Sequence, residues 1–449
     1  AIGGVMDFHL LSPKFGADST LLFPCGAAAR YGSAASEYGG HLDLGLGGRK
    51  LAFVGSASFT SFGDLRMGTQ GPDDYLRPWY SEVINGADSM VINSDPELQV
   101  GSAYDNMNFM GKLAYRPVAS LEIGANFYYS TTSDVPRYDR LIEMRNGAPR
   151  SAEWYYGPQN WLMGNLRIQH QAKRGPWSVA RLTVAYQDYE ESRNDRNFGN
   201  SRLRTQAEHV SGIWGNLDLE KDLGSSTQLL YGAEFVTNDV GSTGQRVDQE
   251  NGEFEVINSR YPDGSSWNTG SVYVGAMRDF NARWTLSAGA RFNWSALECV
   301  FDTSLFPYPA TATSLSNNAL TGNLGLAYRP GTAWKFSLDL STGFRSPNID
   351  DIGKVFDSEP GAVIVPNPQL APEYAYTAEV GIEKVIADRV RLRANGYYIL
   401  LDNAMVRRPY ELNGQDSIMY DGELSRVDAI QNAAQATVLG FWIAVDAKL

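Results

Sequence analysis

The stretch FMGKLAYRPVASLEIGANFYY, residues 109–129, contains two alternating runs joined by a tight corner at Arg116 to Val118. Side chains of a strand point in turn to its two faces. One face of both runs is therefore apolar, with Phe109, Leu113, Tyr115, Leu121, Ile123, Ala125, Phe127 and Tyr129. The other face is wetter, with Met110, Lys112, Ala114, Glu122, Gly124, Asn126 and Tyr128. The stretch is predicted to form an antiparallel hairpin with one apolar and one polar side.

The same unit recurs about seven times along the chain, which makes it the organising element of the fold. Tight corners are predicted at residues 48–49, 116–117, 173–176, 221–225, 278–283, 329–332 and 384–388. Long polar segments lie between them, at approximately 63–104, 131–160, 191–207, 239–267, 298–318, 346–372 and 403–434. Loops this long are uncommon in compact domains unless they have a function. Strands of about ten residues, with short turns on one side and long loops on the other, are typical of a transmembrane β-barrel.

Two further runs show how the barrel is expected to face the membrane. Their apolar sets are Trp284, Leu286, Ala288, Ala290, Phe292 and Trp294, and Trp334, Phe336, Leu338, Leu340 and Phe344. Aromatic residues at both ends of an apolar band are typical of the membrane interfaces. The alternate positions, including Arg291, Lys335 and Asp339, carry charges that need a hydrated interior. A soluble antiparallel protein such as a propeller is the competing fold, but its strands are shorter.

Composition agrees with this all-β, antiparallel prediction. The 449 residues include no apolar stretch long enough to span a bilayer as a helix, and 12% of them are aromatic. The formal net charge of −13 argues against a nucleic-acid partner, which would require a basic surface. We count about fifteen strands, and an odd number cannot close as an ordinary bacterial barrel. We therefore expect a fragment, with more strands after Leu449 and more chain before the opening AIGGV.

Three segments resemble the TonB-dependent outer-membrane receptors. AIGGVMDFHLLSP, residues 1–13, is similar to the last strand of the N-terminal plug of that family. STGFRSPNIDDI, residues 341–352, and PNPQLAPEYAYTAEVGIE, residues 366–383, resemble two strand-and-loop boxes of its barrel. The resemblance implies a 22-stranded plugged barrel, of which about seven strands are missing here. It divides the chain into the end of a plug, residues 1–15, and a partial transmembrane barrel, residues 16–449.

The resemblance also implies a function, which is the energy-coupled import of a scarce nutrient. YGSAASEYGGHLDL, residues 31–44, and SFGDLRMG, residues 61–68, are most similar to receptors for iron complexes or cobalamin. The expected cargo is a metal chelate, namely a ferric siderophore, cobalamin or haem. Haem is less favoured because residues 348–366 contain no histidine, although Tyr can also ligate haem iron.

Partners follow from the same resemblance. They are the outer-membrane lipid bilayer of a Gram-negative bacterium, the TonB energy-coupling complex acting through the missing plug, and a small-molecule ligand. An oligosaccharide importer of the same family, a passive porin or structural barrel, and a barrel enzyme are the alternatives. The first differs only in its substrate, and the second would lack a plug.

Nothing in the sequence indicates catalysis. The histidines His9, His41, His170 and His209 are scattered, and HExxH, CxxC and GxSxG patterns are absent. We therefore expect a non-enzymatic protein with no cofactor and no catalytic or metal site of its own. Cys25 and Cys299 are far apart in sequence, so one disulfide and two lone thiols both remain open.

The two boxes are expected to shape a long loop at both of its stems. Pro347 has no N–H to donate and would end the strand that carries Arg345. The box residues are Phe344, Arg345, Ser346, Pro347, Asn367, Pro368 and Leu370. We favour a role in loop geometry for them over direct contact with ligand.

Ligand contacts are expected in the aromatic-rich loops, at Trp79, Tyr80, Trp154, Tyr155, Tyr156, Tyr410 and Tyr420. Aromatic faces suit planar chelates, corrins and sugar rings alike. The competing role for such residues, especially Trp161, is the aromatic girdle at the membrane interface. Asp350 and Asp351 form a second candidate set, for which solvation of the outer surface is the alternative.

Overall fold

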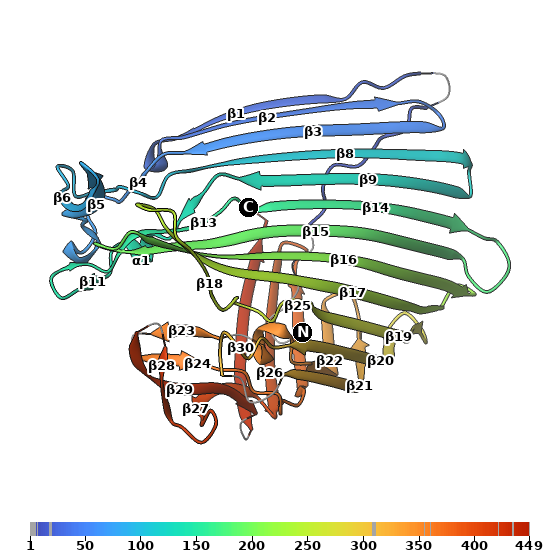
Figure 1. The fold of residues 1–449 in the computed structure, drawn as a ribbon. Helices are drawn as coiled ribbons and strands as arrows, with labels where there is room; N and C mark the ends of the chain where they lie inside the picture. Colours follow the sequence, from blue (N-terminus) through green and yellow to red (C-terminus); the bar gives the residue numbers. More distant parts are fainter. Residues whose placement is uncertain are drawn as a thin grey trace.

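The computed structural model describes residues 6, 8–17, 20–307, 311–353, 355–359, 361–420, 422–432 and 435–448. Sixteen long strands form one curved antiparallel wall (Figure 1). They are β1 (Cys25–Gly32), β2 (Glu37–Gly47), β3 (Leu51–Phe62), β8 (Tyr104–Val118), β9 (Leu121–Thr132), β14 (Asn160–Gln171), β15 (Val179–Asn197), β16 (Arg202–Leu223), β17 (Thr227–Asp248), β19 (Ser265–Asp279), β20 (Trp284–Val300), β21 (Ala312–Tyr328), β22 (Trp334–Arg345), β25 (Glu373–Ile386), β26 (Val390–Asp402) and β30 (Ala436–Ala447). The predicted all-β class is confirmed.

Each long strand pairs with the next one along the chain, so the wall is a simple up-and-down meander. In the predicted hairpin, Phe109 pairs with Tyr129 and Leu113 with Ala125, which confirms that these residues share one face. The predicted corner at Arg116 to Val118 is slightly misplaced: β8 continues to Val118 with a register shift after Tyr115, and the turn falls at residues 119–120. Among the described residues no ladder joins β1 to β30, and the wall is an open sheet.

The connections divide between the two ends of the wall as predicted. One end has tight turns, at residues 48–50, 119–120, 172–178, 224–226, 280–283, 329–333 and 387–389. The other end, called the loop end below, carries the long segments 63–103, 133–159, 249–264, 301–311, 346–372 and 403–435. The short connections 33–36 and 198–201 also lie at the loop end.

The predicted loops at 191–207 and 239–267 are wrong in large part. β15 runs on to Asn197 and β16 begins at Arg202, so only residues 198–201 connect them. β17 likewise continues to Asp248. Most residues of these extensions are polar, on both faces, and this is why the sequence pattern predicted loops there. A ladder in water is held by backbone hydrogen bonds and cross-strand polar pairs, and it needs no apolar face.

The outer face of the wall is apolar. Trp284, Phe336 and Leu338 are 37%, 39% and 41% exposed, while Leu286 is half-buried, and no second layer of described residues covers them. Near the tight turns, the Tyr328 ring stacks 4.2 Å from Trp284 and 6.3 Å from Phe336. This row of rings spans β20, β21 and β22, which is the arrangement of an interfacial girdle. The prediction that these residues point outward, away from a packed protein core, is confirmed.

The inner face is polar. Arg181 forms an ion pair with Glu220, and Arg291 with Glu234. Asn126 donates a hydrogen bond to Asn165 at 2.6 Å across the β9–β14 pair. Such groups are stable only where water or polar partners are available. None of the helices in the described part of the chain is long and apolar enough to cross a membrane.

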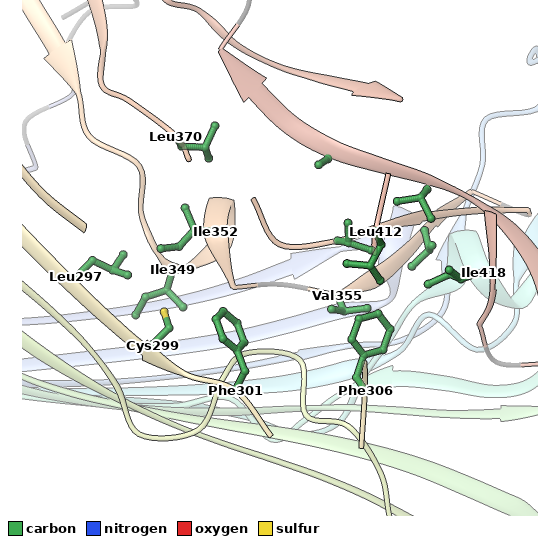
Figure 2. Packing of buried hydrophobic residues seen from close by; sticks show 14 of the residues in the cluster. Leu297, Cys299, Phe301, Phe306, Ile349, Ile352, Val355, Leu370, Leu412 and Ile418 are labelled. Carbon is green, nitrogen blue, oxygen red and sulfur yellow. The ribbon is translucent and has the colours of Figure 1, made fainter. Parts of the chain in front are cut away.

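The largest apolar core lies in the loops rather than in the wall. A small sheet contains β23 (Phe356–Glu359), β24 (Ala362–Ile364), β27 (Met405–Pro409), β28 (Ser417–Tyr420) and β29 (Glu423–Asn432). Beside it lies the short helix α2 (Ile349–Ile352). Figure 2 shows Ile349 and Ile352 of α2 near Leu297 and Cys299 at the end of β20, and Ile418 of β28 on the side of Phe306. We call this cluster the loop core; its members are Val240, Leu297, Cys299, Phe301, Phe306, Ile349, Ile352, Val355, Val363, Val365, Leu370, Leu412, Ile418, Val427 and Ala429.

Shorter elements complete the loop end. The first long loop contains β4 (Leu65–Arg66), η2 (Asp73–Tyr75), β5 (Trp79–Ile84), β6 (Ala87–Ile92) and β7 (Leu98–Gln99). The second contains β10 (Val135–Pro136), α1 (Tyr138–Leu141), β11 (Met144–Arg145), β12 (Ala148–Pro149) and β13 (Ser151–Tyr156). The 3-10 turn η1 (Ser33–Ala35) joins β1 to β2, and β18 (Phe254–Val256) pairs with the end of β17. The β5–β6 hairpin and the small sheet lie at the same end of the wall in Figure 1.

Two further features settle or leave open predictions made from the sequence. Cys25 is exposed and Cys299 is buried in the loop core, and both are free thiols, so the disulfide alternative is wrong. Near the start of the chain, Ser12 and Pro13 lie against the inner face, and the Arg116 guanidinium lies 4.0 Å from the Phe15 ring centroid. Residues 1–5 and 7 of the expected plug segment fall outside the described residues, and its assignment to a plug stays a prediction.

Candidate functional site at the loop end

The second long loop folds back to extend the wall. β13 pairs with the polar extension of β15, so that Trp154 lies opposite Asp195 and Tyr156 opposite Arg193. Odd-numbered residues of β15, such as Arg181, face inward, while Leu182, Val184 and Tyr186 are exposed on the outer face. Cross-strand partners share a face. Trp154 and Tyr156 therefore face the interior of the mouth, and Tyr155, which pairs with Asn194, faces outward.

Two arginines join these rings in one cluster. The Arg137 guanidinium lies 4.8 Å from the Trp154 ring centroid and 5.4 Å from that of Tyr156. Arg193 lies 5.2 Å from the same Tyr156 ring. Arg137 donates a hydrogen bond to the Tyr156 hydroxyl at 2.5 Å and is fixed by Asp139 at 2.7 Å. The face of an aromatic ring attracts a cation, so these contacts hold the side chains in one fixed arrangement. We call Arg137, Trp154, Tyr156 and Arg193 the mouth cluster.

Acidic residues lie next to the mouth cluster on the same inner face. Arg193 forms an ion pair with Glu191 at 2.8 Å, and Tyr189 donates a hydrogen bond to Glu191 at 2.9 Å. Glu208, directly across from Glu191 on β16, lies 3.5 Å from Arg193. Burial raises the pKa of Glu208 to about 7. The outer face at this level carries the polar side chains of Glu190 and His209 instead of apolar ones, which places the pair beyond the apolar band of the wall.

The first long loop is fastened beside this cluster. Asp88 of β6 accepts hydrogen bonds from Arg196 at 2.8 and 2.9 Å and from the Gly199 amide at 2.7 Å. Arg196 also donates a hydrogen bond to Glu153 of β13 at 2.6 Å. Burial alone would raise the pKa of Asp88, but the bonds from Arg196 and Gly199 outweigh it, and the pKa is lowered. This contact holds the β5–β6 hairpin, with its half-buried Trp79 and Tyr80, against the tip of β15–β16.

The first box makes contacts within the protein. The Asp351 carboxylate accepts hydrogen bonds from Arg345 at 2.7 and 2.8 Å and from the Asn348 amide at 3.0 Å. Asp350 accepts a hydrogen bond from the Tyr261 hydroxyl at 2.8 Å. Ser346 lies 3.0 Å from Ser295, and Pro347 is fully buried; Phe344 lies 6.3 Å from the Tyr374 ring. Both candidate carboxylates therefore already accept hydrogen bonds within the protein, and their role in ligand binding stays a prediction.

The second box joins two loops. Asn367 donates a hydrogen bond to the Ile430 carbonyl at 2.8 Å and accepts one from the Gln369 amide at 3.1 Å. Leu370 belongs to the loop core, and Pro368 is half-buried. Asn432 of β29 accepts from the Ala371 amide and donates to the Ala371 carbonyl. These contacts favour the interpretation that the boxes shape the loops.

The remaining aromatic candidates lie elsewhere. Tyr410 and Tyr420 pack against the loop core, and the Tyr420 ring lies 6.4 Å from Phe306. Neither joins the mouth cluster. Trp161 pairs with Tyr189 and lies 6.2 Å from the Tyr128 ring, so it faces inward and is not part of the outer girdle.

One group of described residues brings His and carboxylate ligand atoms within 4.8 Å of one another, namely Asp188, Glu190 and His209. It lies on the outer face, next to the exposed Tyr186, and outside the mouth. The His209 ring already contacts Asp188 at 2.8 Å, and the Tyr186 hydroxyl donates to the same carboxylate at 3.0 Å. These contacts explain why the three side chains lie close together, and we assign no metal site to them.

The sequence named Trp154 and Tyr156, together with Tyr155, as candidate ligand contacts, but it named none of their charged partners. Arg137, Arg193 and Glu208 were absent from the expected site. Arg193 falls in the segment 191–207 that was expected to be loop, and Glu208 comes directly after it, so their shared face could not be derived. The charged residues at every second position, Glu191, Arg193 and Asp195, are the one signal that could have indicated a strand there.

A curved antiparallel wall with an apolar outside, a polar inside and long loops gathered at one end defines a transmembrane β-barrel. The chain belongs to the TonB-dependent receptor family: the profile described as "TonB dependent receptor-like, beta-barrel" matches residues 115–446. The resemblance stated from the sequence is confirmed. No curated protein matches the sequence of this chain.

Solved structures show the same fold. The copper transporter OprC superposes with a TM-score of 0.72 at 12% identity, over 98% of this chain and 60% of that one. The Serratia marcescens hemophore receptor HasR, in complex with its hemophore and heme, has a TM-score of 0.65 at 15% identity, over 96% and 62%. The iron transporter FrpB of Neisseria meningitidis (F3-3 variant) has a TM-score of 0.63 at 12% identity, over 96% and 59%. This chain thus spans about three fifths of these proteins.

Proposed function

We propose that this chain forms most of the barrel of an outer-membrane receptor that imports a metal chelate by energy coupling. The observation that carries the proposal is the mouth cluster, in which two guanidinium groups and two aromatic rings face inward at the loop end. Arginine suits the anionic groups of a chelate, and the rings suit its flat surfaces. Ferric siderophores, haem and cobalamin all combine these properties to some degree.

The division of labour follows from the two faces of the wall. The apolar outer face seals the protein into the outer membrane of a Gram-negative bacterium. The loops capture a ligand that is too large or too dilute to diffuse through a pore. The plug, pulled from the periplasmic side by the TonB complex, then opens a path. No step in this scheme makes or breaks a covalent bond.

An oligosaccharide importer is the second candidate, because aromatic faces also stack on sugar rings. The arginines distinguish the two classes, since a neutral sugar gains little from two guanidinium groups. A passive porin differs in its energetics, since its flux would continue when the proton gradient is collapsed.

Binding to the full-length receptor in detergent tests the proposal. The probes are ferric enterobactin, haem, Cu²⁺, cyanocobalamin and a maltooligosaccharide, followed by tryptophan fluorescence. We expect at least one metal complex to bind and Trp154→Ala or Arg137→Ala to weaken it about tenfold, which corresponds to about 1.4 kcal/mol. Tyr155→Ala is the matched control, because its side chain lies on the opposite face of the same strand. Binding of the sugar alone, or equal losses in control and test variants, would contradict the proposal.

A further inference from the structure

Glu208 is a buried carboxylate without a hydrogen bond. Its residue is 4% exposed, and neither carboxylate oxygen has a hydrogen-bonding partner in the described structure. Arg193 lies 3.5 Å away, yet its own Nε and one Nη remain without hydrogen bonds. An ionised carboxylate in this position loses its hydration and gains only an ion pair of imperfect geometry. Hydration or protonation of this carboxylate would therefore lower its free energy.

One segment of the third long loop, residues 257–263, lies against the wall next to Glu208, and we call it the strap. The strap lies across the inner face of β16 and β17. The Ile257 amide donates to the Gly244 carbonyl at 3.0 Å, and Gln206 donates to the Asn258 carbonyl at 3.1 Å. Further along, the Tyr261 amide donates to Ser242 at 3.3 Å. Ser242 is the cross-strand partner of Glu208, so the strap passes directly over the carboxylate.

The wall is shaped to receive the strap. A Cβ added to Gly244 would lie 2.6 Å from the Asn258 carbonyl oxygen and 2.7 Å from that of Ile257. Both contacts are too close for any side chain, and both are to backbone atoms that cannot rotate away. The strap can therefore lie in this position only because residue 244 is glycine.

Charged groups surround Glu208 on two sides. On β15 these are Glu191 and Arg193, with the neutral phenol of Tyr189, and on the strap the charged group is Arg260, next to the neutral phenol of Tyr261. The two arginines favour the ionised form, whereas burial and Glu191 oppose it, and burial is the largest effect. On the opposite side of the strap, Tyr261 donates its hydroxyl to Asp350 and so connects the strap to α2 and the loop core.

We propose that the strap is a proton-controlled latch, which lies closed over Glu208 when that carboxyl is protonated and lifts when the carboxylate is ionised. Closure covers Glu208, whose carboxylate lies 3.5 Å from Arg193, so the latch determines whether a negative charge stands beside the mouth cluster. This device is separate from the nature of the cargo and operates in the empty receptor.

The direction of the pH dependence follows from linkage. Glu208 has a pKa of about 7 under the strap and an ordinary value of 4.5 when hydrated. The closed arrangement binds the proton more tightly, so its stabilisation is complete below pH 4.5. This stabilisation is lost as the pH rises to about 7 and stays constant above it. Acid therefore closes the latch, and neutral or alkaline conditions open it.

Hydrogen–deuterium exchange of the full-length, ligand-free receptor tests the latch. The readouts are the amides of Ile257 and Tyr261, which bond to Gly244 and Ser242. Their protection is expressed relative to the unstructured peptide, so that the intrinsic effect of pH on exchange cancels. We expect protection at least about tenfold higher at about pH 5 than at about pH 8.

Variants separate the latch from general loop motion. Glu208→Gln is expected to keep both amides protected at both pH values, and Gly244→Ala to leave them unprotected at both. Glu253→Gln, at a side chain that is 71% exposed in the same loop, should behave like the unaltered receptor. Equal protection at the two pH values in the unaltered receptor would overturn the proposal, whether or not the variants assemble. A full pH response in Glu208→Gln would overturn it as well.

Discussion

Asp88 and Arg196 are 108 residues apart in sequence and form a buried ion pair with an N–O distance of 2.8 Å. Their side chains are 5% and 6% exposed. The pair ties the first long loop to the tip of the β15–β16 hairpin, and Glu153 of β13 shares the same arginine. Three segments of the loop end therefore depend on one guanidinium group. The position of Trp79 and Tyr80 relative to the mouth cluster depends on it too.

Replacing Arg196 with Ala should release the first loop while leaving the wall intact. Removing one partner of a buried pair leaves an unpaired charge, and this costs about 3–5 kcal/mol. Protease digestion of the folded receptor should then cut within residues 63–103. Arg66→Ala is the control, because Arg66 and Asp95 are both 43% exposed and such pairs contribute little. If both variants are cut at the same rate as the unaltered protein, the pair does not hold the loop.

The same ion pair predicts a pH dependence opposite to that of the strap. The pKa of Asp88 is lowered from its ordinary value of 3.8. Its contribution is therefore complete above pH 3.8 and is lost as the pH falls through the lower, folded value. The Gly199 amide, which donates to Asp88, should stay protected from exchange at about pH 5 and above. Loss of its protection on going from about pH 5 to about pH 8 would show that another group controls this contact.

Asn432 should be essential to the loop core although it is polar. Its side chain accepts a hydrogen bond from the Ala371 amide and donates to the carbonyls of Ala371 and Asn403, at 2.8–2.9 Å. Asn432→Ala removes three hydrogen bonds that join separate loop segments, each of which contributes about 0.5–1.5 kcal/mol. Exchange of the β29 amides should become faster. Gln435→Ala, which removes one exposed hydrogen bond of 3.3 Å to Asp402, should leave that exchange unchanged.

A charged substitution should destabilise the barrel far more on the outer face than on the inner face. Leu338 and Ser337 are neighbours on β22 with opposite orientations, and only Leu338 belongs to the exposed apolar set. Leu338→Arg is expected to destabilise the barrel by about 2–4 kcal/mol if it lies near the bilayer centre. Ser337→Arg should have a much smaller effect. Urea unfolding of the full-length receptor in liposomes, followed by gel mobility, measures both, and equal effects would contradict the assignment of the two faces.

Alternation in the sequence predicted the wall because each wall strand faces two different solvents. The shared face of Phe109 and Tyr129 follows from that pattern, whereas their pairing depends on the turn at residues 119–120, which lies just after the predicted corner. The ends of β15, β16 and β17 could not be predicted in this way. Once a strand leaves the membrane, water lies on both of its sides, and its residues lose the period of two.

The loop core and the mouth cluster could not be predicted from the sequence either. Val363 and Val427 are far apart in the chain, and only their parallel pairing in the small sheet buries them together. Arg137 reaches Trp154 because β10 and β13 pair across an intervening helical turn. Contacts between loops join residues that are far apart in the sequence, and no local sequence pattern indicates them. The box prolines were visible in the sequence because their effect on the backbone is local.

The central claim is that hydrocarbon covers the outer face of the wall and water fills its interior. Nitroxide labels at Leu338→Cys and Ser337→Cys, in full-length receptor reconstituted into liposomes, test it through their collisions with oxygen and with a water-soluble nickel complex. We predict that the label at 338 collides mainly with oxygen and the label at 337 mainly with nickel. The reverse order, or nickel collisions at both positions, would contradict the account.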